Sequence, residues 1–150
     1  MAIEIELSIS EGVSEANLPS DEQIQRWAQA SYPGSDDAVV SLQVVGSDEM
    51  QALNKTYRGK DKPTNVLSFP MDVPDEIGIN ILGDLALCDT VIEAEAKEQG
   101  KSVEAHWAHM IVHGMLHLQG YDHIEDDEAE AMEAHEIEIM QRLGFENPYK

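Results

Sequence analysis

The most informative stretch of the chain is residues 113–123, which read His-Gly-Met-Leu-His-Leu-Gln-Gly-Tyr-Asp-His. His113 and His117 are four residues apart, so a helix places both imidazoles on one face, about 5–6 Å apart at Cβ. Gly120 is expected to end that helix and to reverse the chain, which brings His123 toward the same point. Three imidazoles with a fourth position open to water are typical of a catalytic zinc site. We therefore predict one Zn²⁺ per chain, at the end of a central helix.

The spacing H-x-x-x-H-x-x-G-x-x-H is that of the metzincin peptidases, with one departure. In those enzymes a glutamate follows the first histidine and acts as the general base. Here that position is Gly114. The metal-binding pattern is intact while the base of the peptidase is missing, so a metallopeptidase is an alternative that Gly114 opposes.

Five of the six histidines fall between residues 106 and 123, so His109 must also be weighed as a ligand. His109, His113 and His117 share one helical stripe, but residues 109 and 117 are separated by about 12 Å of helical rise. Three imidazoles along a straight helix cannot all approach one ion to about 2.1 Å. His123 is therefore preferred as the third ligand, and His109, like His106, is predicted to pack or to support a ligand.

Two carboxylates are further candidates for a general acid or for a group that orients a ligand. Asp84 follows Gly83 in a predicted strand, where it could instead belong to a bulge. Asp122 adjoins His123 and either orients an imidazole or turns the chain.

A third acidic feature is the run of residues 122–138, which holds nine acids and no Lys or Arg. That run predicts the solvated face of a final helix whose apolar stripe is Met132, Ile139, Met140 and Leu143.

The composition excludes several classes of protein. Of the 150 residues 42% are hydrophobic, enough for the core of one domain over residues 1–150. No apolar run approaches the roughly 18 residues of a membrane span, and residues 1–10 lack the basic start of a signal peptide. The single cysteine, Cys88, excludes an intrachain disulfide and a multi-cysteine zinc site. These features favour a cytoplasmic protein without a membrane partner.

Charge is unevenly distributed along the chain. With 9 basic and 30 acidic residues the net charge is −21, which argues against a generally basic nucleic-acid-binding surface. Yet Lys55, Arg58, Lys60 and Lys62 lie within eight residues, with only Asp61 opposing them, a local net of +3. Arginine can bind phosphate bidentately and lysine adds point charge. Beside a predicted metal site, this loop favours phosphate recognition over a merely solvated turn.

Helix and strand patterns alternate along the chain and predict an α+β fold with about four strands and about five helices. The sheet is expected to be mostly antiparallel to mixed. Strands are predicted at residues 3–9, 38–45, 66–69 and 79–87. Helices are predicted after the cap residues Ser20 (with a Gln23 capping box), Ser47 and Asp89, from Ser102, and from about residue 126.

Three segments together resemble the YbeY family of bacterial ribosomal RNA maturation factors, which are metal-dependent endoribonucleases. Residues 57–70 read Tyr-Arg-Gly-Lys-Asp-Lys-Pro-Thr-Asn-Val-Leu-Ser-Phe-Pro, residues 82–84 read Leu-Gly-Asp, and the third segment is the histidine motif at residues 113–123. The resemblance runs in order along nearly the whole chain. Gly114 is normal for this family, so the absence of the peptidase glutamate supports the assignment.

The resemblance implies a cytoplasmic ribonuclease, specific for single strands, that matures the 3′ end of 16S ribosomal RNA and acts in ribosome quality control. It implies zinc on His113, His117 and His123 and a functionally required arginine at Arg58. Implied partners are single-stranded ribosomal RNA and the small ribosomal subunit with its proteins or assembly factors, and DNA is not expected as a substrate.

The residues suggest a mechanism in which zinc activates water and Arg58 binds the scissile phosphate, with His113 and Arg58 as the catalytic pair. Lys55, Lys60 and Lys62 are expected to assist in phosphate binding. Attack by the RNA 2′-OH is an alternative route. A non-catalytic ribosome-assembly module with structural zinc remains the other reading of the same residues.

Overall fold

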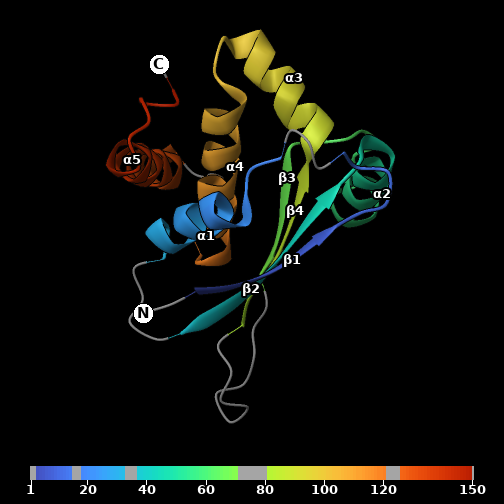
Figure 1. Cartoon of the computed structure of the whole chain (residues 1–150), viewed down its shortest axis with the longest axis horizontal. Helices are drawn as coiled ribbons and strands as arrows, with labels where there is room; N and C mark the ends of the chain where they lie inside the picture. Colours follow the sequence, from blue (N-terminus) through green and yellow to red (C-terminus); the bar gives the residue numbers. More distant parts are fainter. Residues whose placement is uncertain (1–2, 15–17, 33–36, 71–80, 121–125, 150) are drawn as a thin grey trace.

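The computed structural model describes residues 3–14, 18–32, 37–70, 81–120 and 126–149. Within them, helices pack on both faces of one sheet (Figure 1). The elements are β1 (Ile3–Ile9), α1 (Asp21–Ala30), β2 (Ala38–Val45), α2 (Ser47–Arg58), β3 (Val66–Pro70), β4 (Ile81–Cys88), α3 (Asp89–Gln99), α4 (Val103–Leu118) and α5 (Asp126–Arg142). The predicted α+β class, with four strands and five helices in the described ranges, is confirmed.

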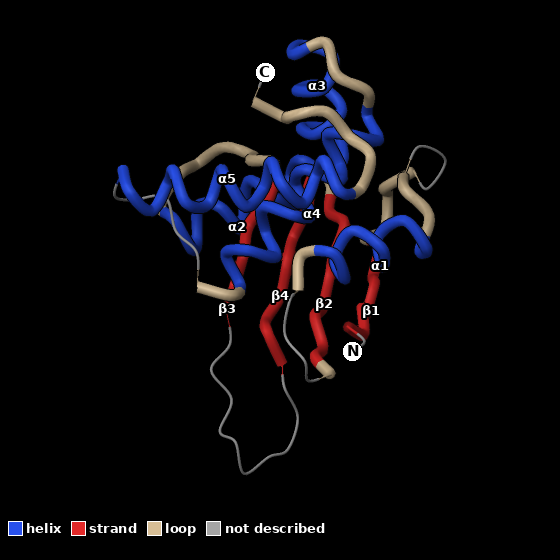
Figure 2. The backbone as a smooth tube through the Cα atoms, turned by 90° about the vertical axis from the view of Figure 1, so that its left-hand side faces the viewer, coloured by secondary structure: helices blue, strands red, loops and turns tan. Residues whose placement is uncertain are grey.

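The sheet has the strand order β1-β2-β4-β3, which Figure 2 shows with β3 at the left and β1 at the right. Strands β1, β2 and β4 are mutually parallel, and only β3 pairs antiparallel, with β4. The sheet is therefore mixed, as predicted, but the expectation of mostly antiparallel pairing is wrong. The reason is that α1 returns the chain to the starting edge between β1 and β2, and the antiparallel strand β3 does so between β2 and β4.

The alternation of residue types in β2 explains why the sheet has two different faces. Val40, Leu42 and Val44 are buried beneath α1 and α4 in the main core, whereas Ser41 and Gln43 lie on the opposite face. At one end of that opposite face α2 covers a second, smaller core. Its buried members are Val45, Met50, Leu67, Ala86 and Cys88. Among the described residues, no other helix covers the rest of this face.

Helix α4 is the central helix of the fold. Buried residues lie all around it, because it packs on β3 and β4 on one side and meets α1, α3 and α5 on the others. A helix that is apolar on every side is stable only in such a position. It ends before Gly120, whose φ of +99° is the left-handed conformation predicted for it. No helix in the described part of the chain is long and apolar enough to cross a membrane.

The N-cap residues of the helices agree with the sequence prediction at some positions and differ from it at others. The Ser20 and Gln23 capping box is present, and Ser102 caps α4 by accepting a hydrogen bond from the Ala105 amide. The predictions that Ser47 and Asp89 act as caps are wrong, because each is the first helical residue. The preceding residues, Gly46 and Cys88, occupy the cap positions without a side-chain bond. At both places a strand runs directly into a helix, so the last extended residue takes the cap position.

Candidate metal centre and RNA cleft

Two of the predicted zinc ligands project from the last two turns of α4. The rings of His113 and His117 have centroids 4.7 Å apart with planes at 76°, the geometry expected from their spacing of one helical turn. Both side chains are half-buried and line the same cleft. The central helix therefore brings two imidazoles together at one opening.

The other half of the histidine motif is not part of what the structure describes. His123 and Asp122 lie outside the described residues, as does the rest of the connection from Gly120 to α5. Among the described residues no group of three potential ligands is present. The third ligand therefore stays a prediction, as does the role of Asp122.

A buried glutamate on α5 supports the histidines from behind. Glu136 has an exposed fraction of 0%. Its Oε1 accepts hydrogen bonds from His113 Nδ1 at 2.7 Å and from His109 Nε2 at 3.2 Å. Its other oxygen accepts one from the Tyr149 hydroxyl. Four side chains from α4, α5 and the C-terminal segment thus form one network, which we call the Glu136 cluster.

The ionisation of Glu136 follows from these contacts. Burial alone would raise the pKa of its carboxyl, but the hydrogen bonds from His109, His113 and Tyr149 outweigh burial and lower that pKa to about 2. Burial together with the Glu136 charge raises the pKa of the Tyr149 hydroxyl, so Tyr149 stays a donor. An ionised carboxylate only accepts hydrogen bonds. Both imidazoles must therefore donate to it.

The structure separates His109 from His113 and His117, the two described histidines that are predicted to bind metal. His109 is buried, donates to Glu136, and packs its ring against Tyr149 with centroids 5.2 Å apart. It does not line the cleft. His106 is also buried and pairs with Glu95 of α3 at 2.9 Å. Both histidines are thus buried and hydrogen-bonded to a glutamate, and the supporting role of His109 stays a prediction.

Arg58 reaches the same cleft from another part of the chain. It is the last residue of α2, which ends at Gly59 in the left-handed conformation, with φ at +70°. The cleft has a volume of about 720 Å³. Its walls are Tyr57 and Arg58 of α2, residues 65–70 at and beside β3, and His113 and His117 of α4. The fold thus places a cation and two imidazoles around one opening large enough for a nucleotide-sized ligand.

The predicted lysines lie beside this cleft rather than in its walls. Lys55, Lys60 and Lys62 are exposed, and none of them lines the opening. Lys55 lies 4.0 Å from Asp61, a contact in which both side chains are largely exposed, so it is weak. These lysines remain candidates for contacts outside the cleft.

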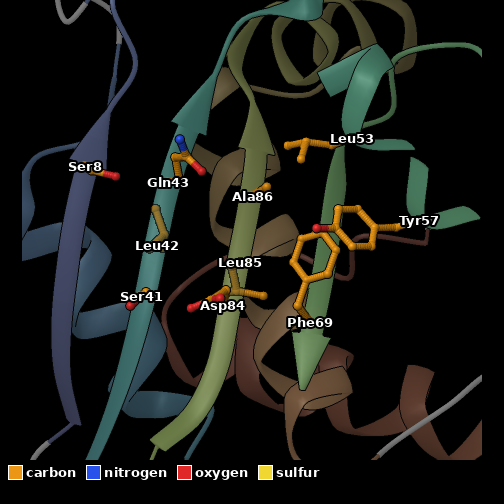
Figure 3. A pocket seen from close by; sticks show the side chains of 10 residues that line it. All are labelled: Ser8, Ser41, Leu42, Gln43, Leu53, Tyr57, Phe69, Asp84, Leu85 and Ala86. Atoms are coloured by element: carbon orange, nitrogen blue, oxygen red, sulfur yellow. The ribbon is translucent and has the colours of Figure 1, made fainter. Parts of the chain in front are cut away.

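Asp84 lies in a different hollow, on the open face of the sheet (Figure 3). This hollow, of about 450 Å³, contains Asp84 with Ser41 and Gln43 of β2, and Tyr57 and Phe69 form its wall toward the cleft. A β-bulge precedes Asp84, since the register between β2 and β4 shifts there. The side chain faces away from α4, so the structure gives no support to Asp84 as an acid acting at the histidines.

Gly114 explains why the peptidase pattern is broken. A Cβ at this position would lie 2.7 Å from Leu85 Cδ2 and 3.3 Å from Val66 Cγ2. The position after the first histidine therefore faces the sheet at close contact, so a side chain there would require the buried Leu85 side chain or the helix to move. The geometry argues against the peptidase alternative independently of the sequence pattern.

The two described imidazoles fit a metal of the zinc type. An imidazole that donates through Nδ1 to a carboxylate, as His113 does to Glu136, is in the tautomer that binds metal through Nε2. Nitrogen ligands of this kind are those that zinc prefers. A carboxylate behind a ligating histidine is also the usual companion of such sites.

Comparison with known proteins decides the family. The sequence model of the family described as endoribonuclease YbeY matches residues 10–144. The chain belongs to the YbeY endoribonuclease family. Its members are endoribonucleases that act in ribosomal RNA processing, so the resemblance noted in the sequence is confirmed.

A solved structure shows the same fold. The chain is similar to a protein from Thermotoga maritima whose solution structure is known, with 28% sequence identity and a TM-score of 0.56. The match covers 93% of this chain and 91% of that one. The architecture described above is therefore found in an experimentally determined protein of nearly the same extent.

Sequence reasoning missed Glu136 and Tyr149. The acidic run of residues 122–138 predicted a solvated face, and this interpretation is wrong for Glu136. A signal was available, because Glu136 lies four residues after Met132 and four before Met140, in the middle of the apolar stripe of α5. Tyr149 follows no periodic pattern, and only the folded chain brings it to Glu136.

Proposed function

We propose that the chain is a zinc-dependent endoribonuclease, specific for single-stranded RNA, whose active site is the cleft between α2, β3 and α4. The observation that carries this proposal is the shared lining of one cleft by Arg58, His113 and His117. These residues are far apart in the sequence, and phosphate recognition beside a metal site is the arrangement that phosphodiester cleavage needs. Membership of the YbeY family supports the same reading.

In this proposal His113, His117 and His123 hold the metal. A zinc ion held by these imidazoles would lower the pKa of a bound water toward neutrality and so would supply hydroxide. The Arg58 guanidinium binds the scissile phosphate bidentately and stabilises the negative charge that develops on its oxygens. The exposed Lys55, Lys60 and Lys62 would contact neighbouring phosphates of the strand.

The biological role that we propose is maturation of the 3′ end of 16S ribosomal RNA and ribosome quality control, in the cytoplasm. The proposed partners are the small ribosomal subunit and its proteins or assembly factors. The net charge of −21 supports such partners. A largely acidic surface binds free RNA poorly, so a protein partner is needed to bring the enzyme to its site.

The test combines metal analysis with an RNA cleavage assay. Zinc is quantified in freshly purified protein, and a labelled single-stranded RNA is then digested by wild type, Arg58→Ala, His113→Ala and Arg142→Ala. Arg142 is exposed at the end of α5 and serves as the charge-matched control. We expect about one zinc per chain, cleavage by wild type and the control, and a loss of at least about 100-fold in the other two. Equal cleavage by all four proteins, or no zinc, contradicts the proposal.

A second substrate separates the two chemical routes. An RNA with one deoxyribose at the cleavage position lacks the 2′-OH that could act as nucleophile. Continued cleavage of this substrate supports attack by water, and loss of cleavage at that position supports attack by the 2′-OH. If Arg58→Ala keeps full activity in ribosome assembly while His113→Ala unfolds, the chain is instead a non-catalytic module with structural zinc.

A further inference from the structure

The Glu136 cluster lies behind the proposed metal site and meets the cleft only through His113. Glu136 and Tyr149 do not line the opening that Arg58 and the histidines share. The cluster nevertheless includes His113, which does. It therefore connects a proposed metal ligand to α5 and to the C-terminal segment.

The cluster determines which nitrogen of His113 carries the proton. Glu136 is fully buried and is the acceptor of three hydrogen bonds. A buried carboxylate with fewer donors would be costly, because each remaining lone pair would lose its water without replacement. The pairing with Glu136 therefore keeps the proton of His113 on Nδ1 and the lone pair on Nε2.

His109 and Tyr149 hold the carboxylate in place. His109 shares Oε1 with His113 from the preceding turn of α4, and Tyr149 binds the other oxygen. The Tyr149 ring also packs edge-on against His109. Because each partner comes from a different turn or segment, rotation of the Glu136 side chain would break at least one of these bonds.

We propose that Glu136 is a positioning residue for the metal site, which orients His113 and fixes its metal-binding tautomer, and that Tyr149 and His109 in turn hold Glu136. This inference rests on the proposed function, since it assigns Glu136 to the same metal site. The ligand concerned is a divalent cation that prefers imidazole nitrogen. The C-terminal segment thereby becomes part of the metal centre, although it lies outside the cleft.

The first measurement uses wild-type protein without metal. Nitrogen chemical shifts of the ¹⁵N-labelled imidazoles at pH 8 report which ring nitrogen of each histidine carries the proton. We expect the proton of His113 on Nδ1 and that of His109 on Nε2. A His113 proton on Nε2 overturns the proposal, and this test does not depend on any variant being folded.

The second measurement compares zinc affinity by competition with a chromophoric chelator. Glu136→Gln keeps the shape of the side chain but loses its charge and one acceptor oxygen. We expect its zinc affinity to fall by about 10- to 100-fold. Tyr149→Phe keeps the ring against His109 and is expected to lose about 3- to 10-fold, as one hydrogen bond to a charged group is removed. Glu138→Gln, an exposed neighbour with the same charge change, is the control and should bind as wild type does.

The outcomes separate this inference from the proposed function. If wild type binds zinc and Glu136→Gln binds it equally well while unfolding more easily, the cluster only joins α4 to α5 and the inference is wrong. If wild type binds no zinc at all, the proposed zinc-dependent function fails, and with it the metal-site role of Glu136. Weakened binding in Glu136→Gln, with Glu138→Gln unchanged, supports both.

Discussion

The contact between α4 and the sheet at Gly114 gives a quantitative prediction for the substitution Gly114→Ala. The new Cβ would lie 2.7 Å from Leu85 Cδ2 and 3.3 Å from both Leu85 Cδ1 and Val66 Cγ2. Carbon atoms in good contact are about 3.5–4.0 Å apart. Either the Leu85 side chain or the helix must therefore move by about 1 Å, and Leu85 is itself only 1% exposed.

Two opposing effects set the size of the change in stability. Overpacking of a well-packed core costs about 1–3 kcal/mol. Replacing glycine by alanine inside a helix stabilises the folded state by about 1 kcal/mol, because alanine has the higher helix propensity. We therefore expect Gly114→Ala to lower the free energy of unfolding by about 1 kcal/mol. Because the substitution adjoins His113, a shift of α4 should also reduce RNA cleavage.

The assay is denaturant unfolding, followed by circular dichroism, of four proteins that form a double-mutant cycle. They are wild type, Gly114→Ala, Leu85→Val and the double variant. Leu85→Val makes room for the new methyl group, so Gly114→Ala should be neutral or stabilising in that background. Ala134→Gly at an exposed position of α5 measures the helix-propensity effect separately. A Gly114→Ala protein that is more stable than wild type by about 1 kcal/mol would show that the close contact has no energetic consequence.

Three further predictions concern charge and protonation. Arg58→Lys should lower kcat/KM for single-stranded RNA by at least about 10-fold, since an ammonium group cannot bind phosphate bidentately; unchanged kinetics would mean that a point charge is sufficient. Burial lowers the pKa of His106 even though Glu95 opposes this shift. The unfolded chain therefore binds the proton more readily than the folded one, so the metal-free wild type should lose stability as the pH falls below the unfolded-state pKa of about 6.5. The loss should be at most about 1.4 kcal/mol in the free energy of unfolding per pH unit. His106→Gln should show a shallower loss between pH 7 and pH 5, and identical pH profiles would contradict this assignment. Binding of isolated enzyme to free RNA should be weak, with a slope of log K against log salt no steeper than about −3 for four cations, and tight binding at physiological salt would contradict the proposed need for a partner.

The local elements could be predicted from the sequence because their signals are local. Strand alternation in residues 3–9 and 38–45 and the Ser20 capping box each depend on a few neighbouring residues, and the structure places these elements as expected. The strand order could not be predicted in the same way. Strands β2 and β4 pair in parallel although α2 and β3 lie between them in the sequence. Such a pairing depends on how the faces of the strands are buried against α1 and α4 in the folded chain.

The site was predictable only where its residues follow a spacing rule. His113 and His117 are one helical turn apart, so their shared face follows from helix geometry alone. Their meeting with Arg58 depends on β3, which carries the chain from the end of α2 along the side of α4. For Glu136 the sequence pattern gave the wrong prediction. An acidic run predicts exposure on average, but one position in it belongs to the buried stripe, and the donors that stabilise a charge there come from other elements.

The uneven charge and the position of the cleft together restrict how an RNA strand can reach the site. The basic loop follows α2 directly, and Arg58 is the basic residue of that group that lines the cleft beside the histidines. Its lysine neighbours are exposed around the same helix end, so attraction for phosphate is concentrated at one edge of the opening. Elsewhere the chain carries 29 acidic residues against five basic ones, and those charges repel a polyanion over a distance of roughly 8 Å at physiological salt. A strand that approaches at random is therefore repelled from most of the surface. A strand that a partner holds near the end of α2 meets a local attraction next to the proposed metal. If the proposed function holds, the net charge favours selectivity, because the acidic surface suppresses cleavage of unassociated RNA while Arg58 stays available to a phosphate inside the cleft.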